Sequence, residues 1–170
     1  MRVGLLAFFV LTFVLSWAVW GSRLAYEQGL AGWQLGEPFV YFAVSGSAVA
    51  TTWMLGRGRA LRAFARRLLL WRVPARWYAA ALLLPALPAL AAVGVYLTFG
   101  GQHDVSALVP LGGALPLLLS QLALHLLTEE AGWRGFALPR LRVLLGPVTA
   151  SLVLGLVWAA WHIPMFFVSG

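Results

Sequence analysis

The sequence predicts an all-α fold: a polytopic transmembrane helix bundle of about five spans, with a basic amphipathic helix at the membrane interface. Hydrophobic residues make up 62% of the 170 positions and charged residues 10%, whereas an ordinary soluble domain has roughly 45–50% and about 25%. A chain this apolar has too little polar surface to cover a folded domain in water. No internal repeat or low-complexity linker interrupts it, so we expect residues 1–170 to form a single membrane domain.

The membrane spans are expected at five apolar runs. They are residues 3–20, 39–55, 77–99, 108–128 and 147–167. The first run, at about 1.5 Å rise per residue, gives roughly 27 Å, close to the thickness of a hydrocarbon core. Ser16 and Ala18 form a small-x-small pattern, so a cleaved signal peptide is the alternative for this run. We favour an uncleaved first span.

The chain has no lysine, and the distribution of its arginines predicts both a surface helix and an orientation. Seven arginines lie between positions 57 and 76, and apolar residues recur among them at helical spacing, which is typical of a basic amphipathic helix on a membrane surface. With the N-terminus inside, every arginine except Arg23 falls on the cytoplasmic side. The net charge of +7 therefore indicates a lipid bilayer as partner and not nucleic acid.

The candidate site lies in the stretch His125–Leu141, HLLTEEAGWRGFALPRL. Two of the five acidic residues, Glu129 and Glu130, are adjacent there at the end of an apolar run. A carboxylate in such a place is rarely without a partner or a function. If residues 125–138 are α-helical, Glu130 lies one turn before Arg134 in the favourable order for an ion pair, and Glu129 points about 100° away. We therefore expect Arg134 to hold Glu130 ionised, and Glu129 to be the carboxylate suited to take a proton from water.

Hydrolysis also requires donors for an oxyanion, and the last apolar run contains candidates. Trp158 and His162 are four residues apart and so lie on one helical face. Two other interpretations remain open. The acidic pair with Arg134 can be an ion-pair cluster that fixes a helix end. A divalent metal such as zinc, bound by Glu129 and His162, is not favoured because the chain has no HExxH motif.

His125 precedes the glutamates by one helical turn. A histidine on an apolar helix is more often a polar helix contact than a metal ligand or a proton relay. We therefore expect His125 to be a helix contact, and we expect no cofactor. The chain has no cysteine, which excludes disulfides and thiolate chemistry.

These residues resemble the CPBP family, the CAAX prenyl proteases of type 2 with their bacteriocin-processing and Abi relatives. EEAGWRG, residues 129–135, is similar to the EExxxR motif of that family, and GFALPRL is similar to the sequence that follows the motif. WAAWHIPMFF is similar to the second motif, an aromatic residue four positions before a histidine, here Trp158 and His162. The resemblance covers about residues 120–170.

The resemblance implies an intramembrane endopeptidase on an all-helical fold, which hydrolyses peptide bonds of membrane-associated peptides or proteins. It implies a multi-pass protein of a bacterial cell membrane, and the arginine distribution predicts that the active site faces the cytoplasm. By analogy, Glu129 activates the attacking water, and His162 binds this water or steadies the oxyanion. Glu130 and Arg134 shape the site, and Trp158 supports it. The family was formerly described as metalloproteases and is now more often described as glutamate proteases.

One departure from the family concerns a third motif, HxxxN or HxxxD, which follows the second. This sequence has no such motif and contains no asparagine. We therefore expect a C-terminally truncated member with incomplete oxyanion donors. The alternatives are a non-catalytic membrane scaffold, a partner-binding or immunity protein, and a metal-dependent membrane protease. A small-molecule transporter is disfavoured, because acids at only one end of the spans provide no midplane ion path.

Overall fold

A computed structural model describes residues 2–36, 38–101 and 111–168 of the chain. The predicted all-α fold is confirmed, and the described residues contain no strand. Contacts divide the chain into two units, Met1–Leu68 with Leu119–Gly170, and Leu69–Leu118. The first unit contains every residue of the candidate site.

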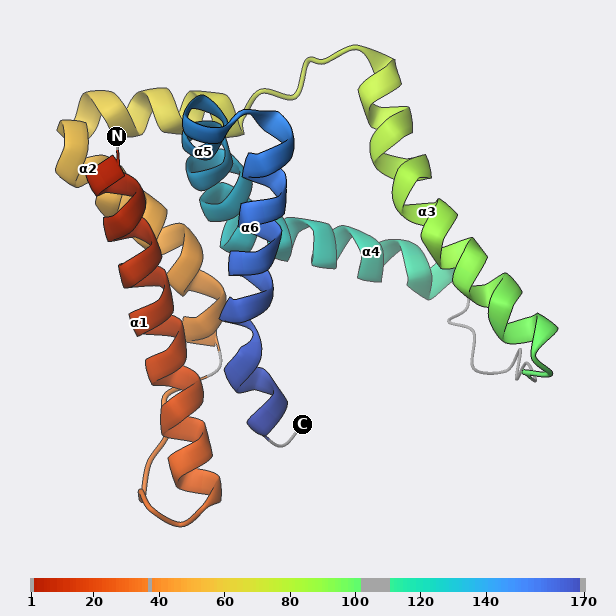
Figure 1. Ribbon diagram of the computed structural model, residues 1–170, viewed down its shortest axis with the longest axis horizontal. Helices are drawn as coiled ribbons and strands as arrows, with labels where there is room; N and C mark the ends of the chain where they lie inside the picture. Colours follow the sequence, from red (N-terminus) through yellow and green to blue (C-terminus); the bar gives the residue numbers. More distant parts are fainter. Residues whose placement is uncertain (1, 37, 102–110, 169–170) are drawn as a thin grey trace. The chain divides into compact units, whose positions relative to one another are not determined.

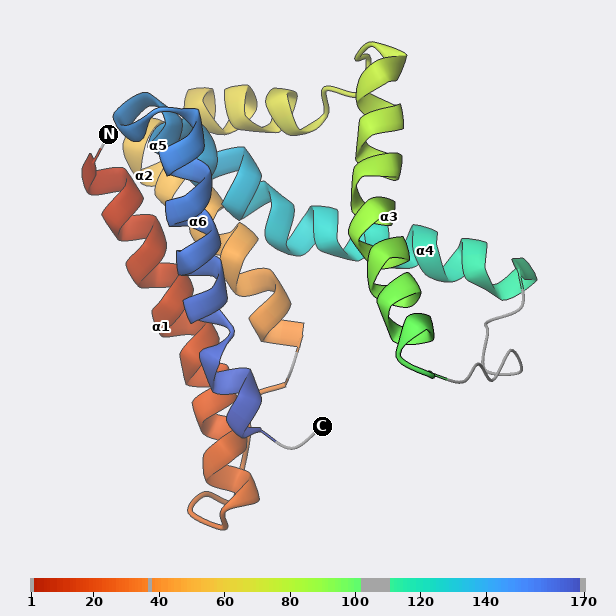
Figure 2. The same cartoon turned by 45° about the vertical axis from the view of Figure 1, so that its right-hand side comes forward.

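The first unit is built from helices of several types. They are α1 (Arg2–Glu27), α2 (Pro38–Leu68), the end of α4 (Leu111–His125), the π-helix η2 (Leu126–Ala137), α5 (Leu138–Leu145), α6 (Pro147–Trp161) and the 3₁₀-helix η3 (Ile163–Phe167). In both views α1, the first arm of α2 and α6 run side by side (Figure 1, Figure 2). The second unit contains α3 (Ala75–Thr98) and the beginning of α4.

Four helices of the described chain are long and apolar enough to cross a membrane. They are α1, α2, α3 and the segment Pro147–Phe167. They agree with four of the five predicted runs, and the chain is an integral membrane protein. The remaining run, residues 108–128, begins outside the described residues, and its described part forms α4 and the start of η2. A span there stays a prediction.

A sharp kink divides α2 into two arms, and it coincides with the predicted boundary between a span and a basic surface helix. Gly56 (φ −162°, ψ 16°) and Arg57 (φ 50°, ψ −146°) leave helical geometry. A Cβ at Gly56 would lie 2.7 Å from the Cβ of Ala60, so the kink requires glycine at this position. Beyond the kink the arginines are exposed and Phe64 is buried, which gives this arm an amphipathic character.

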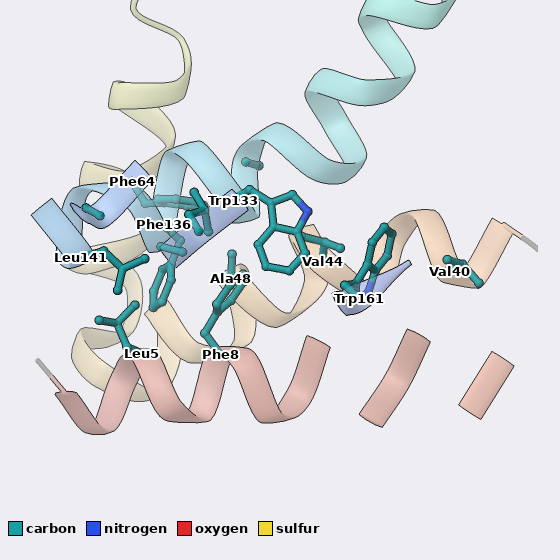
Figure 3. Packing of buried hydrophobic residues seen from close by; sticks show 14 of the residues in the cluster. Leu5, Phe8, Val40, Val44, Ala48, Phe64, Trp133, Phe136, Leu141 and Trp161 are labelled. Atoms are coloured by element: carbon teal, nitrogen blue, oxygen red, sulfur yellow. The ribbon is translucent and has the colours of Figure 1, made fainter. Parts of the chain in front are cut away.

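The core of the first unit is aromatic. The Phe8 ring, fully buried on α1, contacts Trp133 edge-on at 5.6 Å between centroids and Phe136 at 5.0 Å. Trp133 also contacts Trp161 of α6 edge-on at 5.8 Å. Figure 3 shows Phe8 reaching from α1 toward Trp133 and Phe136 of η2. Since lipid is as apolar as these side chains, close packing and not transfer from water holds such helices together.

Two glycines of the EEAGWRG segment allow η2 to lie directly against α2. A Cβ at Gly132 would lie 2.4 Å from Val44 Cγ1 and 2.9 Å from the Val44 carbonyl oxygen. A Cβ at Gly135 would lie 2.6 Å from Leu68 Cδ2, on the arm beyond the kink. Both positions therefore require the smallest residue, as at many close helix contacts in membranes.

A tight turn returns the chain from α5 to α6. Gly146 (φ 77°, ψ 170°) follows α5 in a conformation that L side chains rarely adopt, and Pro147 begins α6. The turn places α6 against α5 and η2. It thereby brings the second sequence motif back to the first.

Candidate active site

The two glutamates lie on a π-helix, so the prediction of an α-helix over residues 125–138 was wrong in helix type. η2 covers 12 residues, and at its end the Leu138 N–H donates to the Trp133 carbonyl five residues earlier. The 100° separation expected between Glu129 and Glu130 does not apply to this wider helix. Glycine is a poor α-helix former, and Gly132 and Gly135 make the contacts with α2, so tertiary packing decides the geometry here. π-Helical turns are rare in proteins as a whole, but those that occur are frequently found at functional sites.

Glu129 is held by Trp158. The indole Nε1 of Trp158 donates to Glu129 Oε2 at 3.0 Å, which joins η2 to α6. A hydrogen bond to an ionised carboxylate is roughly twice as strong as one between neutral groups. Trp158 was expected to support the site, and the structure shows which atom it contacts.

His162 is oriented by the carbonyl of the same tryptophan. At the end of α6 the His162 N–H bonds to the Ala159 carbonyl at 3.1 Å, instead of to Trp158 four residues earlier. The Trp158 carbonyl then accepts from His162 Nδ1 at 2.9 Å. Because a carbonyl only accepts, Nδ1 carries the hydrogen and the neutral ring has its lone pair on Nε2.

The His162 ring lies between two indoles. It contacts Trp158 and Trp161 edge-on, each at 4.6 Å between centroids, with interplanar angles of 78° and 83°. These contacts and the Nδ1 hydrogen bond fix the ring from three directions. Trp158 is thus the residue that Glu129 and His162 share.

The end of α6 is held by α1 through a residue that the sequence motifs did not identify. The Met165 N–H bonds to the His162 carbonyl at 3.0 Å, so the Trp161 carbonyl lacks its usual helical partner. Trp17 Nε1 donates to this carbonyl at 3.1 Å. A tryptophan on an apolar run is an ordinary feature of membrane helices, so no local signal marks Trp17.

Glu130 and Arg134 form the ion pair that their spacing predicted. Their side chains are 34% and 66% exposed, so the pair contributes about 0–1 kcal/mol at most. Glu130 lies outside the four candidate spans, and burial raises the pKa of its carboxyl above the ordinary value, while the charge of Arg134 acts to lower it. Desolvation is thus the larger of the two effects on this carboxyl. The expectation that Arg134 holds Glu130 ionised stays a prediction.

The side chains around Glu129 and His162 do not form a ligand set for zinc. Within the described residues, no three His, Asp or Glu side chains gather in one place, whereas zinc sites in enzymes use three protein ligands. His125 Nδ1 bonds instead to the Gln121 carbonyl at 2.8 Å, the helix contact that was expected of it. The prediction that no cofactor is needed stays a prediction.

A cavity of about 250 Å³ lies beside this constellation, between η2 and α5 on one side and α6 on the other. Its lining consists of Trp133, Arg134, Leu138, Ser151, Leu154, Gly155 and Trp158. Two of these residues, Arg134 and Trp158, belong to the motifs. The cavity itself could not be predicted, because it depends on how η2 and α6 face each other.

Comparisons with known proteins concern the C-terminal part of the chain. A family model described as type II CAAX prenyl endopeptidase Rce1-like matches residues 110–169. The CAAX prenyl protease 2 of Methanococcus maripaludis is 33% identical over 91 residues, which are 52% of this chain and 33% of that protein. The chain thus spans about a third of the length of this relative. No solved structure matches the present chain. The two matches bear out the resemblance that the motifs predicted.

Proposed function

We propose that this chain, whose residues 110–169 match a family model described as type II CAAX prenyl endopeptidase Rce1-like, is an intramembrane endopeptidase in which Glu129 activates water. The observation that carries the proposal is the hydrogen bond from Trp158 Nε1 to Glu129 Oε2, because it joins the carboxylate to the helix end that bears His162. Its substrates are membrane-associated peptides or proteins, since the chain itself is an integral membrane protein.

In the proposed reaction, Glu129 takes a proton from water and the resulting hydroxide attacks the carbonyl carbon of the peptide bond. The carbonyl oxygen becomes an oxyanion. Glu129 then delivers the proton to the leaving nitrogen as the C–N bond breaks, which restores the carboxylate. Trp158 acts through Glu129, whose orientation its indole N–H fixes.

His162 is proposed to bind the attacking water or to stabilise the oxyanion. With the hydrogen on Nδ1, the neutral ring offers the Nε2 lone pair and accepts a hydrogen bond from water. An oxyanion needs a donor, which Nε2 becomes only when the ring is doubly protonated. The pH dependence of the rate therefore distinguishes the two roles, since the second requires the imidazolium.

The environment of the site follows from charge and composition. The arginine distribution would place the glutamates toward the cytoplasmic side of a bacterial cell membrane. Glu130 and Arg134 would shape the site through their ion pair on η2. A lipid bilayer and a peptide substrate are the partners of this proposal.

The experiment is peptide-bond cleavage of a membrane-peptide library by the purified protein in liposomes. We compare the 170-residue chain and its Glu129→Gln variant, each also extended by any downstream HxxxN or HxxxD helix. Cleavage that disappears in Glu129→Gln supports the proposal, and unchanged cleavage with a chelator argues against a metal. No cleavage by any folded form would contradict the proposal and leave a non-catalytic scaffold.

A further inference from the structure

An open cavity of about 530 Å³ lies at the kink of α2, where the apolar first arm is followed by the basic second arm. Figure 1 shows the bend between these two arms. The predicted apolar run ends at Leu55, so we expect the kink at the level of the lipid headgroups. The lining of the cavity includes Met54, Leu55, Arg57, Gly58, Arg59 and Arg62.

The kink arginines, Arg57, Arg59 and Arg62, have no carboxylate partner in the part of the chain that the structure describes. The ion pairs found there lie on α1 and η2 instead. Arg62 Nε donates to the Gly58 carbonyl at 3.4 Å, which directs this side chain back toward the kink and leaves its terminal nitrogens as donors. Three positive charges without a counter-charge favour the binding of an anion among them.

Arg57 occupies its place in the cavity with a strained backbone. Among the described residues it is the only one other than glycine with a positive φ, 50° with ψ −146°. Such strain is found most often at ligand-binding and other functional positions. Glycines flank Arg57 on both sides, and a Cβ at Gly58 would meet no heavy atom within 4 Å. An anion can therefore approach the backbone here without steric hindrance.

The rest of the cavity wall is apolar and indicates the class of anion. Met54 and Leu55 are 70% and 52% exposed, and they directly precede the kink. A free phosphate or an acidic peptide in water would gain little from this apolar surface. A phospholipid has both parts, because its phosphate oxygens accept paired hydrogen bonds from arginine and its acyl chains extend into the bilayer.

We propose that this cavity binds the headgroup of an anionic phospholipid, whose phosphate contacts the kink arginines and whose acyl chains lie against Met54 and Leu55. The inference concerns a site apart from Glu129 and does not depend on the proposed protease function. The basic arm also packs on η2, since the Phe64 ring contacts Phe136 edge-on at 6.5 Å between centroids. A lipid that binds only the folded protein also stabilises it against unfolding.

The first test measures binding of fluorescently labelled phosphatidylglycerol to the full chain in an uncharged detergent. Arg59→Gln combined with Arg62→Gln should weaken binding about 25-fold, since each arginine near an anionic headgroup contributes roughly a fivefold gain. Arg67→Gln combined with Arg142→Gln is the matched control, because both arginines are exposed in the first unit and lie outside the cavity. Absence of saturable binding, or equal losses for the two pairs, overturns the site.

A second variant changes the shape of the cavity and not its charge. Gly58→Leu adds bulk to the cavity lining and should also weaken binding of the labelled lipid. Gly94→Leu is its control, because Gly94 is an exposed helical glycine whose added Cβ also meets no atom within 4 Å. Thermal unfolding shows that each variant is folded. If Gly58→Leu binds the lipid as tightly as the unchanged chain does, the cavity is not the site.

Unlabelled competitors identify the class of ligand. Phosphatidylglycerol should displace the label and raise the thermal midpoint, whereas phosphatidylcholine, whose headgroup has no net charge, should do both far less. Equal displacement by the two lipids would contradict a site for an anionic headgroup. Displacement by inorganic phosphate at the same concentration would indicate a site for a free anion, and stronger displacement by an acidic peptide would indicate a protein partner. Either of these results would show that the lipid inference is wrong.

Discussion

Trp158 Nε1 lies 3.0 Å from Glu129 Oε2, across 29 residues of sequence, and the carbonyl of the same tryptophan accepts a hydrogen bond from His162. One residue thus orients two chemically different groups, one through its side chain and the other through its backbone. A side-chain substitution removes only the first of these contacts. This makes the contribution of Glu129 orientation separately measurable.

Trp158→Phe should therefore lower activity through Glu129 while leaving the carbonyl contact to His162 in place. Loss of a hydrogen bond to a charged group costs about 1.5–3 kcal/mol, so kcat should fall roughly 10- to 150-fold with a smaller change in KM. Steady-state kinetics on a cleaved peptide measures this. Trp53→Phe, at an exposed tryptophan of α2, serves as the control. An unchanged kcat would show that the indole N–H does not position the carboxylate.

His162→Phe should abolish most of the activity without unfolding the protein. Phenylalanine can retain the edge-on packing between Trp158 and Trp161 but has no ring nitrogen. His125→Phe is a close control, because His125 makes the same Nδ1 contact with the carbonyl four residues earlier. We expect a loss of about 100-fold or more for His162→Phe, the range observed when a group that stabilises an oxyanion is removed. Equal rates for both variants would remove His162 from the reaction.

Gly132→Ala should destabilise the first unit, because its Cβ would lie 2.9 Å from the Val44 carbonyl oxygen, a backbone atom that cannot rotate away. Overpacking of this kind costs about 1–3 kcal/mol. Thermal unfolding in detergent should show a lower midpoint for Gly132→Ala than for Gly94→Ala, where the added Cβ meets nothing. If both variants melt together, η2 does not depend on this close approach to α2.

The sequence predicts the parts of the fold that local composition decides. A long apolar run in a membrane has to satisfy its own backbone, so four helices coincide with four predicted runs. The break at Gly56 and Arg57 falls where apolar residues are followed by arginines, so the sequence predicts this boundary. The sequence does not predict the π-helix, because this helix type accompanies contacts of Gly132 and Gly135 with residues far away in the sequence.

The candidate site likewise has contacts that the sequence predicts and contacts that depend on the fold. Spacing alone predicts the Glu130–Arg134 pair, since both residues are on one helix. The hydrogen bond between Glu129 and Trp158 depends on the turn at Gly146, which returns α6 to η2. The role of Trp17 depends on the irregular end of α6 and has no counterpart in local sequence.

The last prediction concerns the dependence of stability on pH through Glu130. Burial raises the pKa of Glu130 in the folded protein above its ordinary value, so between these two pKa values the folded state binds more protons than the unfolded state. Stability should therefore decrease as the pH rises through this window and become level above it. Arg134→Gln removes the charge that lowers this pKa, so the decrease should extend to higher pH. Thermal midpoints measured from about pH 4 upward test this, and Glu130→Gln should remove the contribution in both backgrounds. A contribution of Glu130 that increases with pH would show that the ion pair, and not burial, governs this carboxyl.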